Sequence, residues 1–174
     1  SDVCSSDLLR QSGFSGRVYP VNPRRDTVLG ERAWPSLDAL PEVPDHAFIV
    51  SPTDTVLPAV EAAAALKVPV VTILASGFGE AGAEGAVREA QLLEIARGSG
   101  IRVVGPNSMG VVNVRNHLAL TANAAFAEVD LPRGGTFVAS HSGSMIGALV
   151  SRGKARGIGF ATLVSVGSET DLSL

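Results

Sequence analysis

Residues 68–75 read VPVVTILA, a continuous apolar run rich in β-branched side chains in which Thr72 is the single polar residue. A strand with one solvated face alternates apolar and polar residues, so this run predicts a strand buried on both faces, as in a parallel sheet covered by helices. Apolar residues make up 45% of the chain. Because no run approaches the roughly 20 consecutive apolar residues of a membrane span, we do not expect a membrane protein.

The segments around this run alternate between strand-like and helix-like patterns. Strands at this spacing are joined by right-handed crossovers, which predicts a Rossmann-like parallel sheet with helices on both faces. The helix over 53–67 begins at Thr53 as a predicted N-cap, and the helix over 85–100 ends at Gly98 and Gly100. Strands are predicted over 17–22, 46–51, 68–75 and 101–105, and helices over 35–44, 53–67 and 85–100.

The pattern stops after 105 and restarts at 136. Pro132, Gly134 and Gly135 in EVDLPRGG predict a linker over 128–135. A strand over 136–140, a helix over 146–156 and a strand over 159–167 follow. We therefore expect a first domain over 9–127 and the first βαβ unit of a second α/β domain over 136–174, which cannot complete its sheet within these residues.

Residues 1–8, SDVCSSDL, resemble a translated sequencing adapter and have no apolar period, so we expect them to be non-native and leave them out of the predicted fold. Cys4 is the single cysteine, which excludes a disulfide framework and a cysteine-based zinc site; we predict no metal site and a cytoplasmic location. The net charge of −3 and the few scattered aromatic residues make nucleic acid a poor partner.

Open parallel sheets bind ligands beyond the carboxyl ends of their strands. At the first such end, Arg24 and Arg25 stand where an NAD site presents an acidic residue, and an arginine pair suits a phosphorylated ribose, as in NADP or coenzyme A (CoA). The alternative is a solvated turn with two exposed arginines. The small residues of SPTDT (51–55) and ASGFGE (75–80) would let backbone N–H groups approach a pyrophosphate or a pantetheine chain. The alternative is that both stretches are ordinary turns. Asn107 in GPNSMG fits a ligand contact and a rigid turn equally well.

The stretch SHSGS at 140–144 joins a predicted strand to a predicted helix. Ser142 as a nucleophile would need a G-x-S-x-G turn and a base, and neither His46 nor His117 has a recognisable triad context. Hydroxyls and unpaired N–H groups at a helix start, aided by the helix dipole, instead predict a phosphate-binding turn. Its predicted residues are Ser140, Ser142, Gly143 and Ser144.

Five motifs in order resemble a known family: GRVYPVNPR, PSLDALPEVPD, SGFGEAG, GIRVVGPNSMG and TFVASHSGSMIGAL with GIGFATLVSVGSETDL. They are similar to the CoA-binding domain, and to the start of the following succinyl-CoA-synthetase-like, flavodoxin-type domain, of NDP-forming acyl-CoA synthetases. The resemblance covers residues 9–174. It implies a ligase that makes acyl-CoA from a carboxylic acid, CoA and ATP through an acyl phosphate and a phosphohistidine.

The resemblance also assigns roles by position. It implies that the 140–144 turn faces the phosphohistidine or free phosphate. The family position of His141 is commonly Gln or Arg, so we assign His141 no catalytic role, and the phosphohistidine is expected beyond Leu174. The residues that fall where the family binds CoA are Val21, Asn22, Pro23, Arg24, Arg25, Ser51, Pro52, Thr53, Ala75, Ser76, Gly77, Phe78 and Gly79, with Asn107 as a further candidate from its turn.

The chain also departs from the family pattern. The first strand and its glycine turn have no counterpart before Leu9, and the ATP-grasp domain or subunit that would hold ATP or ADP and magnesium has none within these residues. We therefore expect a fragment that is inactive alone. Two other interpretations stay open: a CoA-binding regulatory module of a protein acyltransferase, and an NADP-dependent oxidoreductase.

Overall fold

Three parallel strands form the first sheet in the computed structural model, which describes residues 5–127 and 131–172. They are β3 (His46–Ile49), β4 (Val70–Ile73) and β5 (Arg102–Val104), in the order β3-β4-β5. Val71, Thr72 and Ile73 are fully buried. The predicted buried strand within 68–75 is thus confirmed, and with it the Rossmann-like parallel sheet.

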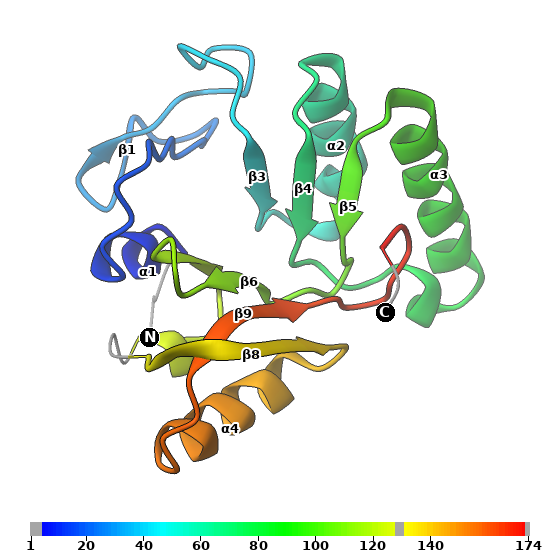
Figure 1. Cartoon of the computed structure of the whole chain (residues 1–174). Coiled ribbons are helices and arrows are strands. Elements are labelled where there is room, and N and C mark those ends of the chain that lie inside the picture. Colours follow the sequence, from blue (N-terminus) through cyan, green and yellow to red (C-terminus); the bar gives the residue numbers. More distant parts are fainter. Residues whose placement is uncertain (1–4, 128–130, 173–174) are drawn as a thin grey trace.

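Two helices, α2 (Val56–Ala65) and α3 (Ala83–Ser99), cover this sheet. They contact each other and lie on the same face, with α2 behind the strands and α3 to their right in Figure 1. The prediction of helices on both faces was wrong because the strand order advances in one direction, and right-handed crossovers then place successive helices on one side. Thr53 is not the N-cap of α2: it begins a 3-10 turn, η1 (Thr53–Thr55), that precedes the helix.

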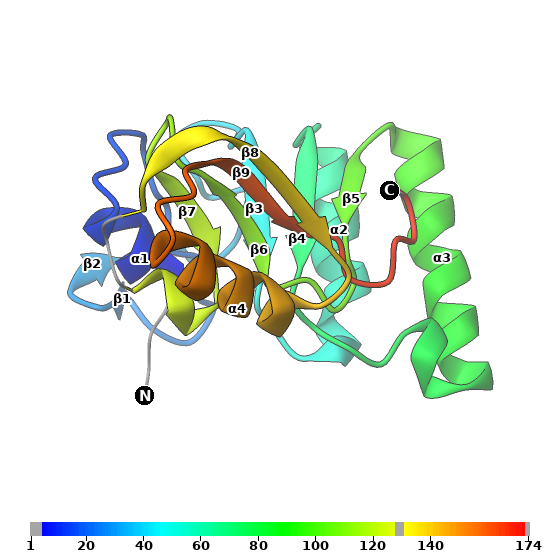
Figure 2. The ribbon, with the colours of Figure 1, turned by 60° about the horizontal axis from the view of Figure 1, so that its bottom comes forward.

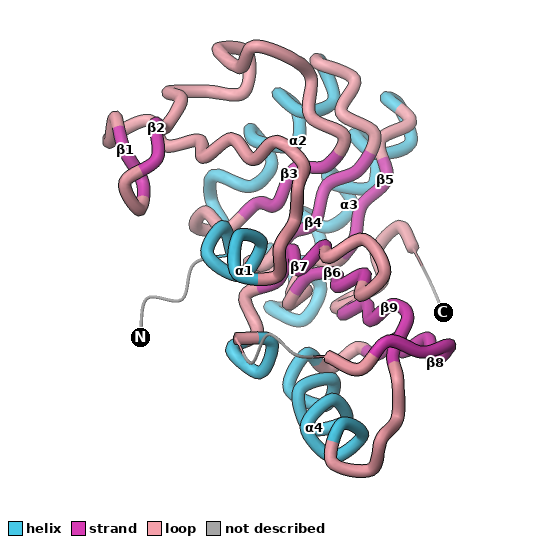
Figure 3. Tube along the Cα trace, turned by 60° about the vertical axis from the view of Figure 1, so that its left-hand side comes forward, coloured by secondary structure: helices cyan, strands magenta, loops and turns pink. Residues whose placement is uncertain are grey.

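Residues 17–45 contain neither the strand nor the helix predicted there. Val21 makes one isolated bridge to Trp34, and Pro20 has no N–H to continue a ladder. No strand precedes residues 17–22 in the described part of the chain to serve as a neighbour. Three prolines interrupt 35–44. A small hairpin of β1 (Thr27–Val28) and β2 (Glu31–Arg32) stands apart from both sheets instead (Figure 3).

The second sheet has four strands in the order β7-β6-β9-β8. β6 (Gly110–Asn113) is antiparallel to β7 (Leu118–Thr121) and to β9 (Phe160–Ser165), while β8 (Arg133–Ser140) is parallel to β9. β6 and β7 precede the predicted linker over 128–135, but β6 pairs with β9 beyond it, so this sheet contains residues from both sides of the expected boundary. Residues 128–130 of that linker lie outside the described residues, and β8 already begins at Arg133.

Helix α4 (Gly143–Lys154) connects β8 to β9, as the predicted βαβ unit requires, and lies on one face of the second sheet (Figure 2). Its buried side chains Ile146 and Val150 pack with Phe126, Phe160 and Leu163 into a second core. Phe126 belongs to a 3-10 turn, η3 (Ala124–Phe126), that follows β7. The carboxyl end of β8 and the start of α4 thus have a rigid support.

The described part of the first eight residues is helical. α1 (Ser5–Gln11) packs against β7, and Leu8 and Leu9 are buried. Leu8, which was left out of the predicted fold, is thus part of the buried interior. Residues 1–4 lie outside the described residues, and the non-native origin of the segment stays a prediction.

The burial of His46 predicts how the free energy of unfolding depends on pH. Its imidazole is mostly buried, its Nε2 lies 2.8 Å from Thr72 Oγ1, and burial lowers the pKa of His46 to about 4. The folded state therefore keeps His46 neutral while the unfolded chain takes up a proton below a pKa of about 6.5, so stability falls as the pH drops from about 6.5 toward 4. Between about pH 7.5 and pH 5 we expect a loss of about 2 kcal/mol from this group.

Urea unfolding of the native chain and of His46→Gln at both pH values measures this loss. The substituted glutamine keeps a hydrogen-bonding side chain that does not titrate, so the variant should lose about 2 kcal/mol less than the native chain. Equal losses in both proteins would show that His46 does not carry the effect.

Candidate functional site

The turns after β3, β4 and β5 meet at one edge of the first sheet, where the three arrowheads end in Figure 1. Thr53 Oγ1 donates a hydrogen bond to the carbonyl of Ser76 at 2.8 Å. The N–H of Asn107 donates to the carbonyl of Ala75, also at 2.8 Å. The structure thus brings together the predicted site residues of 51–53, 75–79 and 107 as one continuous edge.

The two glycines of the second of these turns lie against neighbouring side chains. Gly77 has a φ of +94°, and a Cβ there would lie 3.0 Å from Thr53 Cγ2. A Cβ on Gly79 would lie 1.9 Å from Glu89 Oε2. The side chains of Thr53 and Glu89 fill these positions, and of the two glycines Gly79 is exposed and Gly77 half-buried.

The N–H groups of this turn are used within the protein. The N–H of Gly77 donates to Glu80 Oε1 at 2.5 Å, and Arg88 donates to the carbonyl of Gly77. Glu80 lies in a 3-10 turn, η2 (Gly79–Ala81), directly before α3. The expectation that N–H groups of 75–80 approach a pyrophosphate is corrected for Gly77, because a carboxylate already accepts its hydrogen bond.

The turn over 21–25, which contains Arg24 and Arg25, is separate from this edge. The N–H of Asn22 donates to the carbonyl of Trp34 at 2.8 Å, and Asn22 Oδ1 accepts from the N–H of Arg24 at 2.9 Å. Pro23, Arg24 and Arg25 are exposed. Among the described residues, no hydrogen bond joins this turn to 51–53, 75–79 or 107, so the structure does not bring its five predicted residues into the continuous edge.

Ser51 carries the one polar side-chain atom in the described residues that is buried and lacks a hydrogen-bond partner, its Oγ. Buried hydroxyls are nearly always paired, and leaving one unpaired costs roughly 1–3 kcal/mol. This atom lies in a turn that the sequence already marked as a ligand contact.

The second candidate site is the start of α4. Ser142 is the N-cap: its Oγ accepts from the N–H of Met145 at 3.3 Å and lies 3.0 Å from Ser144 Oγ. Ser140 Oγ accepts from the N–H of Ser142 at 3.1 Å. The first N–H groups of a helix have no partner within it, so this arrangement leaves those of Gly143 and Ser144 for an external acceptor. The predicted turn is thus confirmed as a helix start, with Ser140 and Ser142 serving the turn itself.

The contacts of Ser142 do not support its interpretation as a nucleophile. Each histidine is bonded elsewhere: His46 to Thr72, His117 to Ser12, and His141 through Nδ1 to the carbonyl of Gly167 at 3.0 Å. No base is therefore within hydrogen-bond reach of the Ser142 hydroxyl in the described part of the chain.

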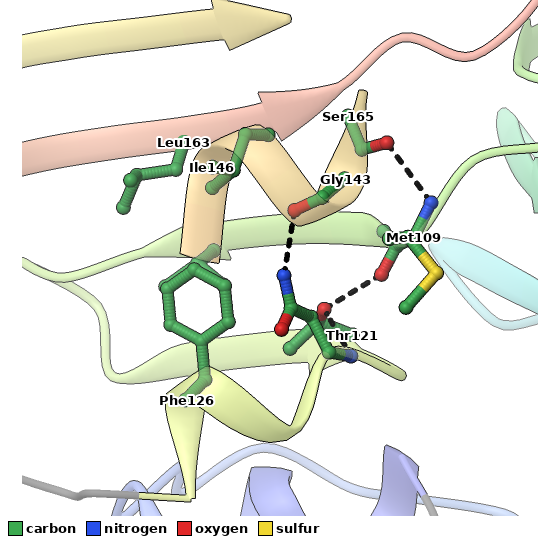
Figure 4. A pocket seen from close by; sticks show the side chains of 10 residues that line it. Met109, Thr121, Phe126, Gly143, Ile146, Leu163 and Ser165 are labelled. Atoms are coloured by element: carbon green, nitrogen blue, oxygen red, sulfur yellow. Dashed lines mark hydrogen bonds between the residues drawn. The ribbon is translucent and has the colours of Figure 1, made fainter. Parts of the chain in front are cut away.

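Residues that the sequence analysis missed hold this helix start in place (Figure 4). Asn123 Nδ2 donates to the carbonyl of Gly143 at 2.8 Å, while Ser165 Oγ accepts from the N–H of Met109 at 3.0 Å. A Cβ on Gly143 would lie 2.0 Å from Met109 Cγ. Only about 10 Å³ of space remains beneath Gly143. A sequence signal existed for Asn123 alone, as a capping residue before AAF.

The two candidate sites adjoin through residues 166–170. The N–H of Ser168 donates to the carbonyl of Pro106 at 2.9 Å, and Gly167 lies against the same carbonyl. His141 Nε2 is 3.6 Å from Glu169 Oε1. Residues 166–170 therefore contact both the edge of the first sheet and the turn that leads into α4.

Two further observations concern the described residues as a whole. No helix among them is both long and apolar enough to cross a membrane. No three His, Cys, Asp or Glu side chains within 5–127 and 131–172 come together as metal ligands would.

Comparisons with known proteins match the chain to a family and to several enzymes. Residues 6–114 match the family described as "CoA binding domain". The 4-hydroxybutyrate–CoA ligase (ADP-forming) of Nitrosopumilus maritimus is 38% identical over 162 residues, which are 93% of this chain and 23% of that protein. The alpha subunit of acetate–CoA ligase (ADP-forming) II of Pyrococcus furiosus is 37% identical over 90% of this chain and 33% of that subunit.

Solved structures agree. The apo form of acetyl-coenzyme A synthetase 1 of Ca. Korarchaeum cryptofilum, described as dinucleotide forming, has a TM-score of 0.89 and 32% identity over 98% of this chain and 36% of that chain. The same enzyme in complex with phosphate and ADP has a TM-score of 0.88 and 32% identity. The chain spans about a quarter of the length of most of the curated relatives it matches.

Proposed function

The chain belongs to the CoA-binding domain family, and we propose that it binds coenzyme A as part of an ADP-forming acyl-CoA synthetase. The observation that carries this proposal is the continuous edge of 51–53, 75–79 and 107, which lies where open parallel sheets bind cofactors. The exposed glycine backbone and the orphaned Ser51 hydroxyl fit an extended ligand that carries hydrogen-bonding groups.

The chemistry of the edge suggests an orientation for the cofactor. The Ser76–Gly79 turn offers glycine backbone, but the N–H of Gly77 already donates to Glu80. The turn therefore suits the uncharged pantetheine part of CoA. Arg24 and Arg25 belong to a separate turn outside this edge; they are exposed and suit the phosphate groups of the long cofactor, including the 3′-phosphate of the ribose. CoA itself supplies the thiol that becomes the thioester.

The start of α4 is the phosphate site of this proposal. Gly143 and Ser144 offer N–H groups at the positive end of the helix dipole, and Ser144 adds a hydroxyl. The contacts of 166–170 with Pro106 keep this helix start beside the continuous edge. A phosphoryl group held there would lie next to the sheet edge that binds the thiol cofactor.

The remainder of the reaction belongs to the whole protein. We propose that it joins a carboxylic acid to CoA with ATP through an acyl phosphate and a phosphohistidine, with an ATP-grasp domain or subunit holding the nucleotide and magnesium. Relatives described as alpha subunits support a separate or fused partner. This chain contributes binding residues and no catalytic residue to that scheme.

Calorimetric titration with CoA and with dephospho-CoA tests the proposal. The native chain should bind CoA saturably, and Arg24→Ala/Arg25→Ala should weaken CoA binding about tenfold because charge-assisted bonds to phosphate are lost. Dephospho-CoA lacks the 3′-phosphate, so the same double variant should affect its binding less.

Arg152→Ala/Arg156→Ala, which removes two exposed arginines near the end of α4, is the matched control and should bind CoA like the native chain. Binding of NADP without binding of CoA would contradict the proposal and favour an oxidoreductase. Equal losses for CoA and dephospho-CoA in the Arg24/Arg25 variant would contradict the orientation alone.

A further inference from the structure

The peptide group between Ser76 and Gly77 is held from both ends. Its carbonyl accepts a hydrogen bond from Thr53 Oγ1 at 2.8 Å, and its N–H donates to Glu80 Oε1 at 2.5 Å. The carbonyl and the N–H of one trans peptide point in opposite directions. Two side chains from different elements, η1 and η2, therefore fix the plane of this peptide between them.

The next peptide group, between Gly77 and Phe78, is held in the same way. Arg88 of α3 donates to its carbonyl, and the guanidinium lies 5.9 Å from the centre of the Phe78 ring. Partial burial by itself would raise the pKa of Glu80, but hydrogen bonds from the N–H groups of Gly77, Glu80 and Phe78, with the charge of Arg88, lower it below the ordinary value. The Glu80 carboxylate thus stays ionised at neutral pH and accepts from the turn.

This turn needs such support. Gly77 has a φ of +94° and no side chain, so its backbone has more freedom to lose on folding than any other residue type. Phe78 is fully buried and anchors one side of the turn. Without the Glu80 carboxylate, the Gly77 N–H would be unpaired and the peptide could rotate.

We propose that Glu80 is a positioning residue for coenzyme A, whose carboxylate holds the Ser76–Phe78 backbone in the conformation that receives the cofactor. This inference rests on the proposed function. Glu80 does not touch CoA. It accepts hydrogen bonds from the N–H groups that could otherwise bind a phosphate, so the turn suits the uncharged part of the ligand. Binding then requires no ordering of the turn, which preserves affinity.

Glu80→Ala should weaken CoA binding roughly tenfold, the cost of losing charge-assisted hydrogen bonds and of ordering the turn. Glu80→Gln keeps an acceptor oxygen without the charge and should lose less. Glu84→Ala removes an exposed acid four residues away, in the first turn of α3, and is the matched control that should leave binding unchanged. Calorimetric titration of the four proteins with CoA measures these changes.

A second readout needs no ligand. A hydrogen bond to a carboxylate shifts an amide proton downfield, so the Gly77 amide proton of the native chain should move upfield in Glu80→Ala and stay in place in Glu84→Ala. If the native chain does not bind CoA, the proposed function fails, whatever the amide signals show. If it binds CoA but Glu80→Ala binds equally well, or Glu84→Ala loses as much, the positioning role is overturned, as it is if the Gly77 amide does not move.

Discussion

Gly85→Ala is expected to lower the free energy of unfolding by about 2–3 kcal/mol, within the range measured for overpacked cores. Gly85 is buried in the first turn of α3, and a Cβ there would lie 1.8 Å from the carbonyl oxygen of Phe78 and 2.7 Å from its carbonyl carbon. The obstacle is backbone and cannot rotate away. The helix and the 75–79 turn must separate, so CoA affinity should fall together with stability.

Gly98→Ala is the matched control in the same helix. Nothing lies within 4 Å of a Cβ at Gly98, and alanine favours a helix over glycine by about 1 kcal/mol. Urea unfolding should therefore move the two variants in opposite directions, with Gly98→Ala stabilised. If Gly85→Ala is as stable as the native chain, α3 does not pack directly on the turn.

Gly167→Ala is expected to cost about 3 kcal/mol, from backbone strain of about 1 kcal/mol and overpacking of about 2 kcal/mol. Gly167 has a φ of +62°, and a Cβ there would lie 2.0 Å from the carbonyl oxygen of Pro106 and 2.9 Å from the carbonyl carbon of Asn107. The substitution pushes 166–170 away from 105–107. It should therefore separate the start of α4 from the sheet edge.

Gly157→Ala measures the cost of backbone strain without a steric clash. Gly157 has a φ of +72° and nothing within 4 Å of a built Cβ, so its substitution should cost only the strain, about 1 kcal/mol. Thermal and urea unfolding of both variants compare the costs. Equal costs would contradict direct contact between Gly167 and the Pro106 turn.

The parts of the fold that could be predicted from sequence are those that local pattern determines. β4 lies in a run whose single polar residue is Thr72, and α3 ends at Ser99, followed by Gly100 in the left-handed conformation expected of a helix stop. Non-local pairing was not predicted. Gly110 of β6 pairs with Ser165 of β9, 55 residues later, and nothing local in GVVN marks that partner.

The candidate site divides in the same way. The turns after β3, β4 and β5 could be placed because a strand's carboxyl end follows from chain direction, and Ser142 because capping is local. The hydrogen-bond partners of individual polar groups could not be predicted. Glu80 accepts from the N–H of Gly77, and Asn123 donates to the carbonyl of Gly143, because tertiary structure brings these groups together.

Titration of the isotope-labelled chain with CoA, followed by amide chemical shifts, tests most directly whether the carboxyl edge of the first sheet binds the cofactor. The amides of Ser51 and Thr53, of residues 76–79 and of Asn107 should shift saturably. Those at the amino ends of β4 and β5, residues 66–68 and 100–101, should not. No saturable shift, or shifts confined to the amino ends, would contradict the account.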